Sequence, residues 1–221
     1  MVKIIWGCGL AWYDLRFGTS QPRFKSGHPH FIFMADLLNK VKIFVNDSFK
    51  GKNILHFERT LYWINYFRPN ADKALQIAAY AHDIERAYRT AEIAAIHKKS
   101  EKGFQDDEFL KHHQERGAEI IGEFLIKEGA SKELIERVKM LVLKHEHGGN
   151  EDQDLLKDCD TLSFFETNAD MFIKEKAKIL GKKKVKSKFD WMFNRLSSNK
   201  VKEVARPLYL NALEDLEKQA E

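Results

Sequence analysis

Apolar residues recur at helical spacing through most of the chain. The stretch that begins at Met34 shows it first, because Leu37, Val41 and Val45 lie about one turn apart. No alternating segment of useful length follows residue 34. The pattern therefore predicts an all-α fold, a compact multi-helix bundle, with helices at about 34–49, 53–67, 70–97, 106–128, 131–147, 152–178 and 188–219.

Short punctuated loops separate these helices. Asn53, Asn70 and Ser131 stand at N-cap positions, and glycines mark the breaks. The longest segment, 70–97, is expected to be two helices that meet near Asp83 to Arg86, because a His-Asp pair used for chemistry is most accessible near a helix end.

The first 33 residues differ from the rest. Four glycines and two prolines interrupt any helical period there, and two of the four tryptophans lie there. We interpret residues 1–33 as a non-helical arm, either a non-native upstream extension before Met34 or a short arm packed on the domain. Residues 34–221 form the predicted helical domain.

Composition narrows the class of protein. With 221 residues, 43% hydrophobic and 32% charged, the chain has the balance of a soluble globular protein with a substantial core. Its apolar runs are far shorter than a membrane-spanning helix, so no membrane partner is expected. The two cysteines form no disulfide or zinc-finger pattern, and the cytoplasm is the expected compartment.

The charge gives little support to nucleic acid as a partner. The net charge is +4, but residues 1–33 hold four basic residues and one acid, which is +3 and leaves +1 for the rest. A run of lysines follows Gly181, at 182, 183, 184, 186 and 188. We interpret it as a mobile loop, or as a lid over an anionic substrate. The oligomeric state stays open.

Three histidines are predicted to point inward. His56 shares a helix face with Trp63 and Phe67. His113 precedes an apolar stripe, whereas its neighbour His112 precedes charged residues. His145 continues an apolar series, and His147 is rotated about 200 degrees from it.

One carboxylate belongs with them. Asp160 lies on a face with Leu156 and Phe164. Each buried group alone could be satisfied by hydrogen bonds. Together they are costly, and a divalent ion would compensate several at once. Imidazoles with carboxylates suit a divalent ion such as manganese, iron, cobalt, nickel, zinc or magnesium, with water in the open positions.

The order of these residues resembles the HD superfamily of metal-dependent phosphohydrolases. The resemblance rests on His56, the pair His82-Asp83 and Asp160 on successive helices, and it covers residues 34–180. His113-Gln-Glu-Arg-Gly-Ala and Asp160-Thr-Leu are similar to accessory motifs, and His145-Glu-His-Gly-Gly to a small branch of the superfamily. The resemblance implies one metal on His56, His82, Asp83 and Asp160. Where a second ion binds, it implies that Asp83 bridges and that His113 and His145 join.

The chain also departs from the better-known members. Many phosphodiesterase members read HDIGK, whereas this chain reads His82-Asp-Ile-Glu-Arg. We expect Asp83, Glu85 and Arg86 in catalysis, with Glu85 as proton shuttle and Arg86 orienting the phosphate. Further candidate phosphate contacts are Arg59, Lys144 and Arg195, for which the alternative is a solvated charge or an ion pair.

The sequence thus predicts a hydrolase that cleaves a phosphomonoester or phosphodiester of a nucleotide or another small phosphorylated metabolite. Two other functions stay open. One is a di-iron oxygenase on the same fold, since six His/Asp ligands can hold two irons. The other is a non-catalytic regulator that binds a nucleotide.

Overall fold

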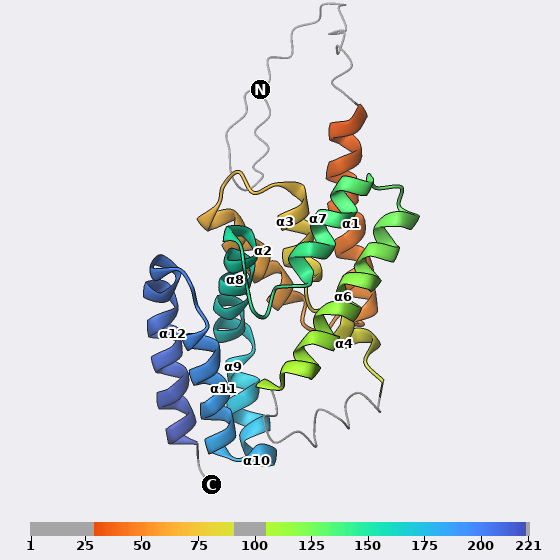
Figure 1. Ribbon diagram of the computed structural model, residues 1–221. Helices are drawn as coiled ribbons and strands as arrows, with labels where there is room; N and C mark the ends of the chain where they lie inside the picture. The colour runs from red at the N-terminus through yellow and green to blue at the C-terminus, as the bar shows by residue number, and fades with distance from the viewer. Residues whose placement is uncertain (1–28, 91–104, 220–221) are drawn as a thin grey trace, which may run out of the picture.

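The computed structural model describes residues 29–90 and 105–219. It confirms the all-α prediction, because the elements over these residues are helices and turns without a strand (Figure 1). The helices are α1 (Pro29–Ser48), α2 (Ile54–Phe67), α3 (Lys73–Ala81), α4 (Glu85–Tyr88), α6 (Asp107–Lys127), α7 (Lys132–Val142), α8 (Glu151–Thr167), α9 (Ala169–Met171), the π-helical η2 (Phe172–Lys176), α10 (Ala177–Leu180), α11 (Lys182–Asn194) and α12 (Asn199–Lys218).

α3 is the centre of the domain. Its alanines at 78, 79 and 81 and Tyr80 are completely buried, and it packs against α1, α2, α7 and α8. Small side chains let these neighbours approach closely. Asp72 caps the helix by accepting a hydrogen bond from the Leu75 amide at 2.9 Å. The cap is therefore Asp72 and not Asn70.

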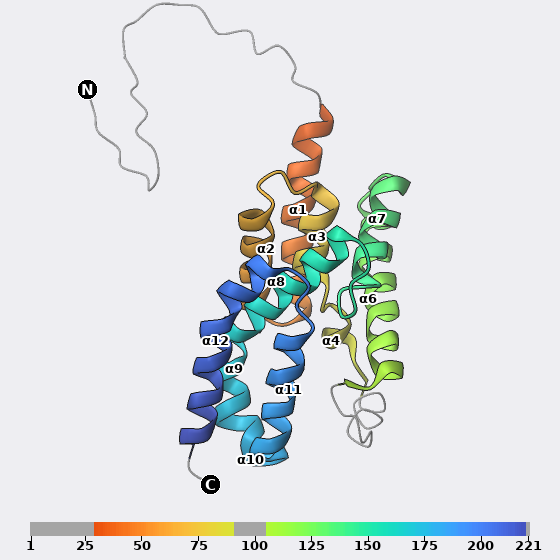
Figure 2. The ribbon, with the colours of Figure 1, turned by 60° about the vertical axis from the view of Figure 1, so that its left-hand side comes forward.

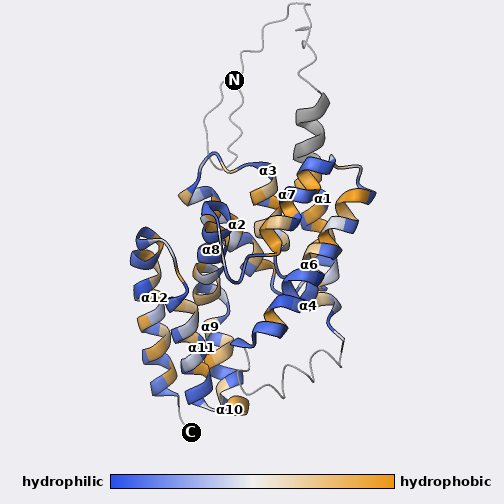
Figure 3. Ribbon diagram, viewed as in Figure 1, coloured by the Kyte–Doolittle hydropathy of each residue, from blue (hydrophilic) through white to orange (hydrophobic). Residues whose placement is uncertain are grey.

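Two groups of helices flank α3. α6 and α7 pack together on one side, and α11 and α12 pack together on the other, where α12 also contacts α8 (Figures 1 and 2). Along α11 and α12 hydrophilic and hydrophobic residues alternate, as in helices with one buried face (Figure 3). A second apolar cluster lies between α8, η2, α11 and α12, with Phe164, Phe172 and Phe189 at its heart.

Several helix boundaries differ from those predicted. α1 begins at Pro29, five residues before the helix start predicted at Met34. The other residues of the predicted arm, 1–28, lie outside the described residues. The helix predicted at 131–147 ends at Val142, and turns continue to residue 147. The lysine run after Gly181 belongs to α11 and is not a loop.

The segment predicted as one helix at 188–219 is two. It is interrupted at residues 195–198, where Ser198 caps α12. The cause lies elsewhere in the chain, because the buried Asp158 carboxylate accepts hydrogen bonds from the Ser197 and Ser198 amides at 2.8 to 3.2 Å. None of the helices within the described ranges has both the length and the apolarity needed to cross a bilayer.

Candidate metal centre

Four side chains from three separate parts of the chain converge at the end of α3. His56 comes from α2, His82 and Asp83 from the turn after α3, and Asp160 from α8. The Nε2 atoms of His56 and His82 lie 3.3 Å apart, and Asp160 Oδ1 is 3.2 and 3.3 Å from them. Asp83 Oδ2 is 3.8 Å from each Nε2. The four ligands expected for one ion therefore meet at one point.

The local sequence explains the position of the pair. α3 ends at Ala81, and a turn closes with the Ile84 amide on the Ala81 carbonyl at 3.0 Å. α4 begins at Glu85. The predicted break in this segment is thus present, at residues 82–84, and it contains His82 and Asp83.

A second group of ligands shares Asp83. Asp83 Oδ1 lies 3.1 Å from His113 Nε2 and 3.9 Å from His145 Nε2. His113 comes from α6, and His145 from the turn after α7. Glu146 adds its Oε1, at 3.9 and 3.8 Å from the same two nitrogens. Both groups have the composition and spacing of a metal site, and Asp83 belongs to both.

Each imidazole is held through its other nitrogen. His56 Nδ1 donates to Ser163 Oγ at 2.9 Å. His82 Nδ1 donates to the Ala79 carbonyl at 3.0 Å, and His145 Nδ1 donates to the Val142 carbonyl at 2.7 Å. In metal sites such bonds fix the tautomer, so that Nε2 carries the free lone pair.

His113 is oriented by Glu85. Its Nδ1 donates to Glu85 Oε2 at 2.7 Å, and the same carboxylate binds Arg89. Burial raises the pKa of Glu85, but His113 and Arg89 outweigh it and lower that pKa to about 2. Glu85 does not line the cavity beside the ligands. The structure therefore places Glu85 behind a ligand and not in the position of a proton shuttle.

The unpaired Nε2 atom of His145 indicates that these residues fit a metal ion. Among the buried side-chain polar atoms of the described residues, its Nε2 is the one without a hydrogen-bond partner. Burial lowers the pKa of His145 to about 4, so the ring is neutral and its lone pair is available at pH 7. Such an orphan acceptor is costly unless something binds it. The donor set of imidazoles and carboxylates suits a borderline divalent ion.

The carboxylates of Asp83 and Asp160 are ionised. Burial raises the pKa of Asp83, but Arg86, His82 and His113 outweigh it, so the pKa lies well below its ordinary value. The pKa of Asp160 is lowered in the same way, with the close contacts of its carboxylate to His56 and His82 as the main opposing causes. Both carboxylates are therefore negatively charged at pH 7.

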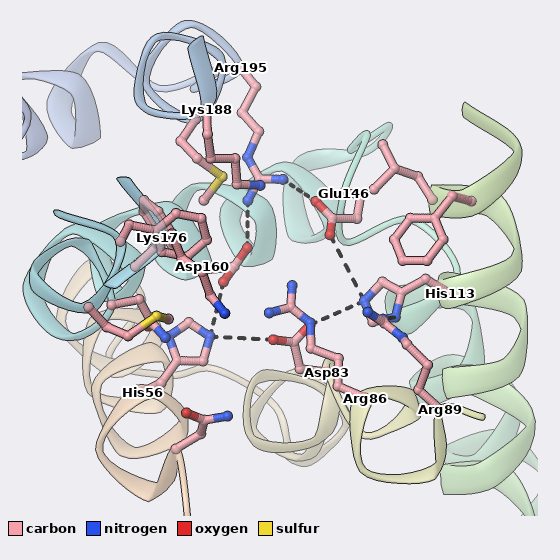
Figure 4. A pocket seen from close by; sticks show the side chains of 18 residues that line it. His56, Asp83, Arg86, Arg89, His113, Glu146, Asp160, Lys176, Lys188 and Arg195 are labelled. Carbon is pink, nitrogen blue, oxygen red and sulfur yellow. Dashed lines mark hydrogen bonds and ion pairs between the residues drawn. The ribbon is translucent and has the colours of Figure 1, made fainter. Parts of the chain in front are cut away.

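A cavity of about 310 Å³ opens over both groups (Figure 4). His56, Asp83, His113, Glu146 and Asp160 contribute to its lining. Five cationic side chains also line it, namely Arg86, Arg89, Lys176, Lys188 and Arg195. The rest of the wall is formed by two polar and six apolar residues, namely Asn53, Asn168, Phe109, Leu110, Phe164, Met171, Phe172 and Met192.

Arg195 joins the two ligand groups. Its guanidinium binds Asp160 Oδ2 at 2.5 Å, Thr161 Oγ1 at 3.0 Å and the Glu146 carboxylate. Lys188 lies on the same side of the cavity (Figure 4), with its ammonium 4.3 Å from the centre of the Trp191 ring. Burial lowers the pKa of Lys188 to about 7.

The comparison with protein families gives one match. Residues 38–216 match the family described as "Domain of unknown function (DUF4202)". The chain belongs to this family. No curated protein and no solved structure matches it. All ligand candidates and the cavity-lining residues of the DUF4202 domain lie within the matched range.

Two predicted phosphate contacts lie away from the cavity of the DUF4202 domain. Arg59 forms a bidentate pair with Glu166 at 2.7 Å, and Trp63 donates to the same carboxylate. Lys144 is exposed and lines a separate depression next to His147. The structure thus brings Arg86 and Arg195 to the site, but not Arg59 or Lys144. It also selects His145 over the exposed His147.

Two functional candidates were missed from the sequence of the DUF4202 domain, and a third, Lys188, was named only as part of the lysine run. Glu146 was visible in the His145-Glu-His-Gly-Gly motif, and its place beside a buried histidine was the available signal. Lys188 was one of five lysines in a run, and only the helical register of α11 separates it from the others. Lys176 has no signal in the sequence, since its position depends on η2.

Proposed function

We propose that this protein is a metal-dependent phosphohydrolase. The observation that carries the proposal is the position of Asp83, which is shared by two histidine groups on the floor of a cavity lined by five cations. The ligand groups suit one or two divalent ions. The cations suit a phosphorylated substrate, because guanidinium and ammonium groups bind phosphate oxygens.

The ligands divide into two sets in this proposal. His56, His82, Asp83 and Asp160 would hold one ion, and His113, His145 and Glu146, together with Asp83, would hold a second. A bound divalent ion supplies a water of lowered pKa as nucleophile and offsets negative charge on a phosphoryl oxygen. The protein itself fixes the imidazoles through Ser163, Ala79, Glu85 and Val142, so that the ligands need no reorganisation.

Arg86 is the proposed orienting group for the phosphate. Its Nε lies 3.0 Å from Asp83 Oδ1, and its side chain is 45% exposed, so it can turn towards a ligand in the cavity. Arg195 is 8% exposed and bound to two carboxylates, which suits it for holding Asp160 and Glu146 in place. The apolar wall with Phe109 and Phe172 would contact the organic part of a small substrate.

The resemblance to the HD superfamily supports the same reaction. It concerns the order of His56, His82-Asp83 and Asp160, with His113 and His145 as additional ligands. These six residues lie close together around the cavity. Membership of DUF4202 in that superfamily is part of the proposal.

The decisive experiment combines elemental analysis of the purified chain with a screen of phosphomonoesters and phosphodiesters in several divalent ions. The double variant His82→Ala/Asp83→Ala should lose both the bound metal and the hydrolysis. His147→Ala is the matched control, because this exposed histidine is two residues from His145. Full hydrolysis by the double variant would disprove the mechanism.

The same measurements separate the two alternatives. Iron in protein purified without oxygen, together with oxygen uptake and no phosphoester cleavage, would indicate a di-iron oxygenase. Nucleotide binding that survives chelation, without turnover of any phosphoester, would indicate a regulator. The lining favours the phosphohydrolase, because three guanidinium groups and two lysines, of which Lys188 has its pKa lowered to about 7, suit an anionic substrate better than a neutral one.

A further inference from the structure

The helix after α8 contains a π turn at the wall of the cavity. η2 spans Phe172–Lys176, and the Ala177 amide donates to the Phe172 carbonyl, five residues earlier. An α-helix bonds to the fourth preceding residue, so this turn holds one residue more than its neighbours. Regular α-helical bonding resumes when the Gly181 amide binds the Ala177 carbonyl at 2.9 Å.

The extra residue changes which side chain faces the cavity. From this stretch, Asn168, Met171, Phe172 and Lys176 line it. In an uninterrupted α-helix the residue two turns after Asn168 is Glu175, because two turns hold about seven residues. With the π turn, that place falls to Lys176, and Glu175 is exposed. The turn therefore brings Lys176 further towards this point of the wall and moves Glu175 away from it.

We propose that η2 makes Lys176 a specificity-determining residue, which binds an anionic group of the substrate together with Lys188. This role rests on the proposed function: the substrate of the phosphohydrolase would present a negative charge to the wall formed by η2 and α11. π turns inside α-helices are frequent at functional sites. Here the turn determines the sign of the charge that η2 presents to the cavity.

The charges of the cavity support this role. Arg86, Arg89 and Arg195 are engaged with Asp83, Glu85 and Asp160 respectively. Within the described part of the chain, the ammonium of Lys176 makes no ion pair or hydrogen bond. It is half-buried, whereas Lys174 and Lys178 on the same stretch are exposed. Figure 4 shows Lys176 and Lys188 on the opposite side of the cavity from His113.

The test measures binding of inorganic phosphate to the full chain by calorimetry in the presence of Mn²⁺. Lys176→Met should weaken binding about tenfold, since a charge-assisted hydrogen bond to phosphate is lost. The exchange variant Glu175→Lys/Lys176→Glu keeps composition and net charge, and it should weaken binding further because a carboxylate then faces the anion. Lys178→Met is the matched control and should bind like the wild type.

Three results would overturn the inference. The first is a wild-type chain that does not bind phosphate, and the second is Lys176→Met with unchanged affinity. The third is an exchange variant that binds phosphate as tightly as the wild type or more tightly, and a tighter variant would place residue 175 at the cavity. The proposed function is tested separately by turnover. If the variants follow the expected order but no phosphoester is cleaved, the anion site stands and the phosphohydrolase does not.

Discussion

Asp83 places its Oδ1 3.1 Å from Nε2 of His113 and thereby ties the second ligand group to the first. Its other oxygen faces His56 and His82 at 3.8 Å. A carboxylate whose two oxygens point to different ligand sets can bridge two ions, and Asp83 has this arrangement. The two groups are therefore expected to depend on each other through this one side chain.

Replacing Asp83 by Asn should affect both groups, whereas Asp160→Asn should affect only the group that contains His56 and His82. Changes behind a ligand already cost about 10- to 100-fold in metal affinity, so the loss of the bridging ligand should cost more than about 100-fold. Metal titration and elemental analysis of both variants check this. Equal metal contents in Asp83→Asn and wild type would contradict a bridging role.

His145→Ala should weaken binding at the second group by about 100-fold or more, because it removes the orphan Nε2 acceptor. His147→Ala is the matched control, since this exposed ring contacts Gln114 and lies outside the cavity lining. Metal binding is measured by titration with Mn²⁺ or Zn²⁺. If both variants lose metal equally, the selection of His145 is wrong.

The parts of the fold that follow local patterns were predictable from the sequence. The helical period, the cap at Ser131 and the inward direction of His56, His113 and His145 depend on residues within one or two turns. The buried positions of these histidines follow from their apolar neighbours along the same helix. Asp160 was predictable for the same reason.

Features set by distant contacts were not predictable. The break before α12 depends on Asp158, whose carboxylate binds amides about 40 positions later. Glu85 looked available for proton transfer in the sequence, but His113 and Arg89 surround its carboxylate in the fold. Arg59 was placed near His56 by its spacing, yet Glu166 from α8 holds it outside the cavity. Local periodicity contains no information about such partners.

Arg195→Met should destabilise the metal-free protein by about 3 to 5 kcal/mol, because it leaves the Asp160 and Glu146 carboxylates buried without their cation. Arg59→Met is the control. Its pair with Glu166 is 30% and 19% exposed, and it should cost about 1 kcal/mol. Urea unfolding in chelator gives both values. Added Mn²⁺ should narrow the deficit of Arg195→Met, and a deficit that does not change with metal would argue against binding at Asp160 and Glu146.

Alkaline pH should destabilise the protein through Tyr80. Burial raises the pKa of Tyr80 to about 12, with Glu58 adding to it, and the hydroxyl donates to Asn46 Oδ1 at 3.0 Å. The unfolded tyrosine ionises near pH 10, about two units lower. The contribution of Tyr80 is thus complete below pH 10 and is lost as the pH rises to 12.

The measurement is the free energy of unfolding between pH 9 and pH 12, at about half-unit steps. Tyr80→Phe should show a shallower decline than the wild type over this window. Tyr66→Phe, at a tyrosine that is 59% exposed, should follow the wild type. Parallel curves for all three proteins would show that Tyr80 ionises normally in the folded state.

Gly148 holds the turn that carries His145 and Glu146, and Gly148→Ala should disturb the second ligand group. Gly148 has φ of +78°, and an added Cβ would lie 2.0 Å from Asp154 Oδ1. Gly129, with φ of +71°, has open space around the same position. Gly129→Ala should therefore cost only the backbone term, about 1 to 2 kcal/mol, because a side chain disfavours this conformation.

Gly148→Ala should cost about 3 kcal/mol, since the clash with Asp154 adds to the same backbone term. Asp154 also binds the Gly149 amide at 3.2 Å and Lys157 at 3.1 Å, so moving it loosens the turn before α8. Metal titration then distinguishes stability from function. Gly148→Ala should bind the second ion more weakly while Gly129→Ala binds it normally, and equal affinities would mean that the turn does not position His145.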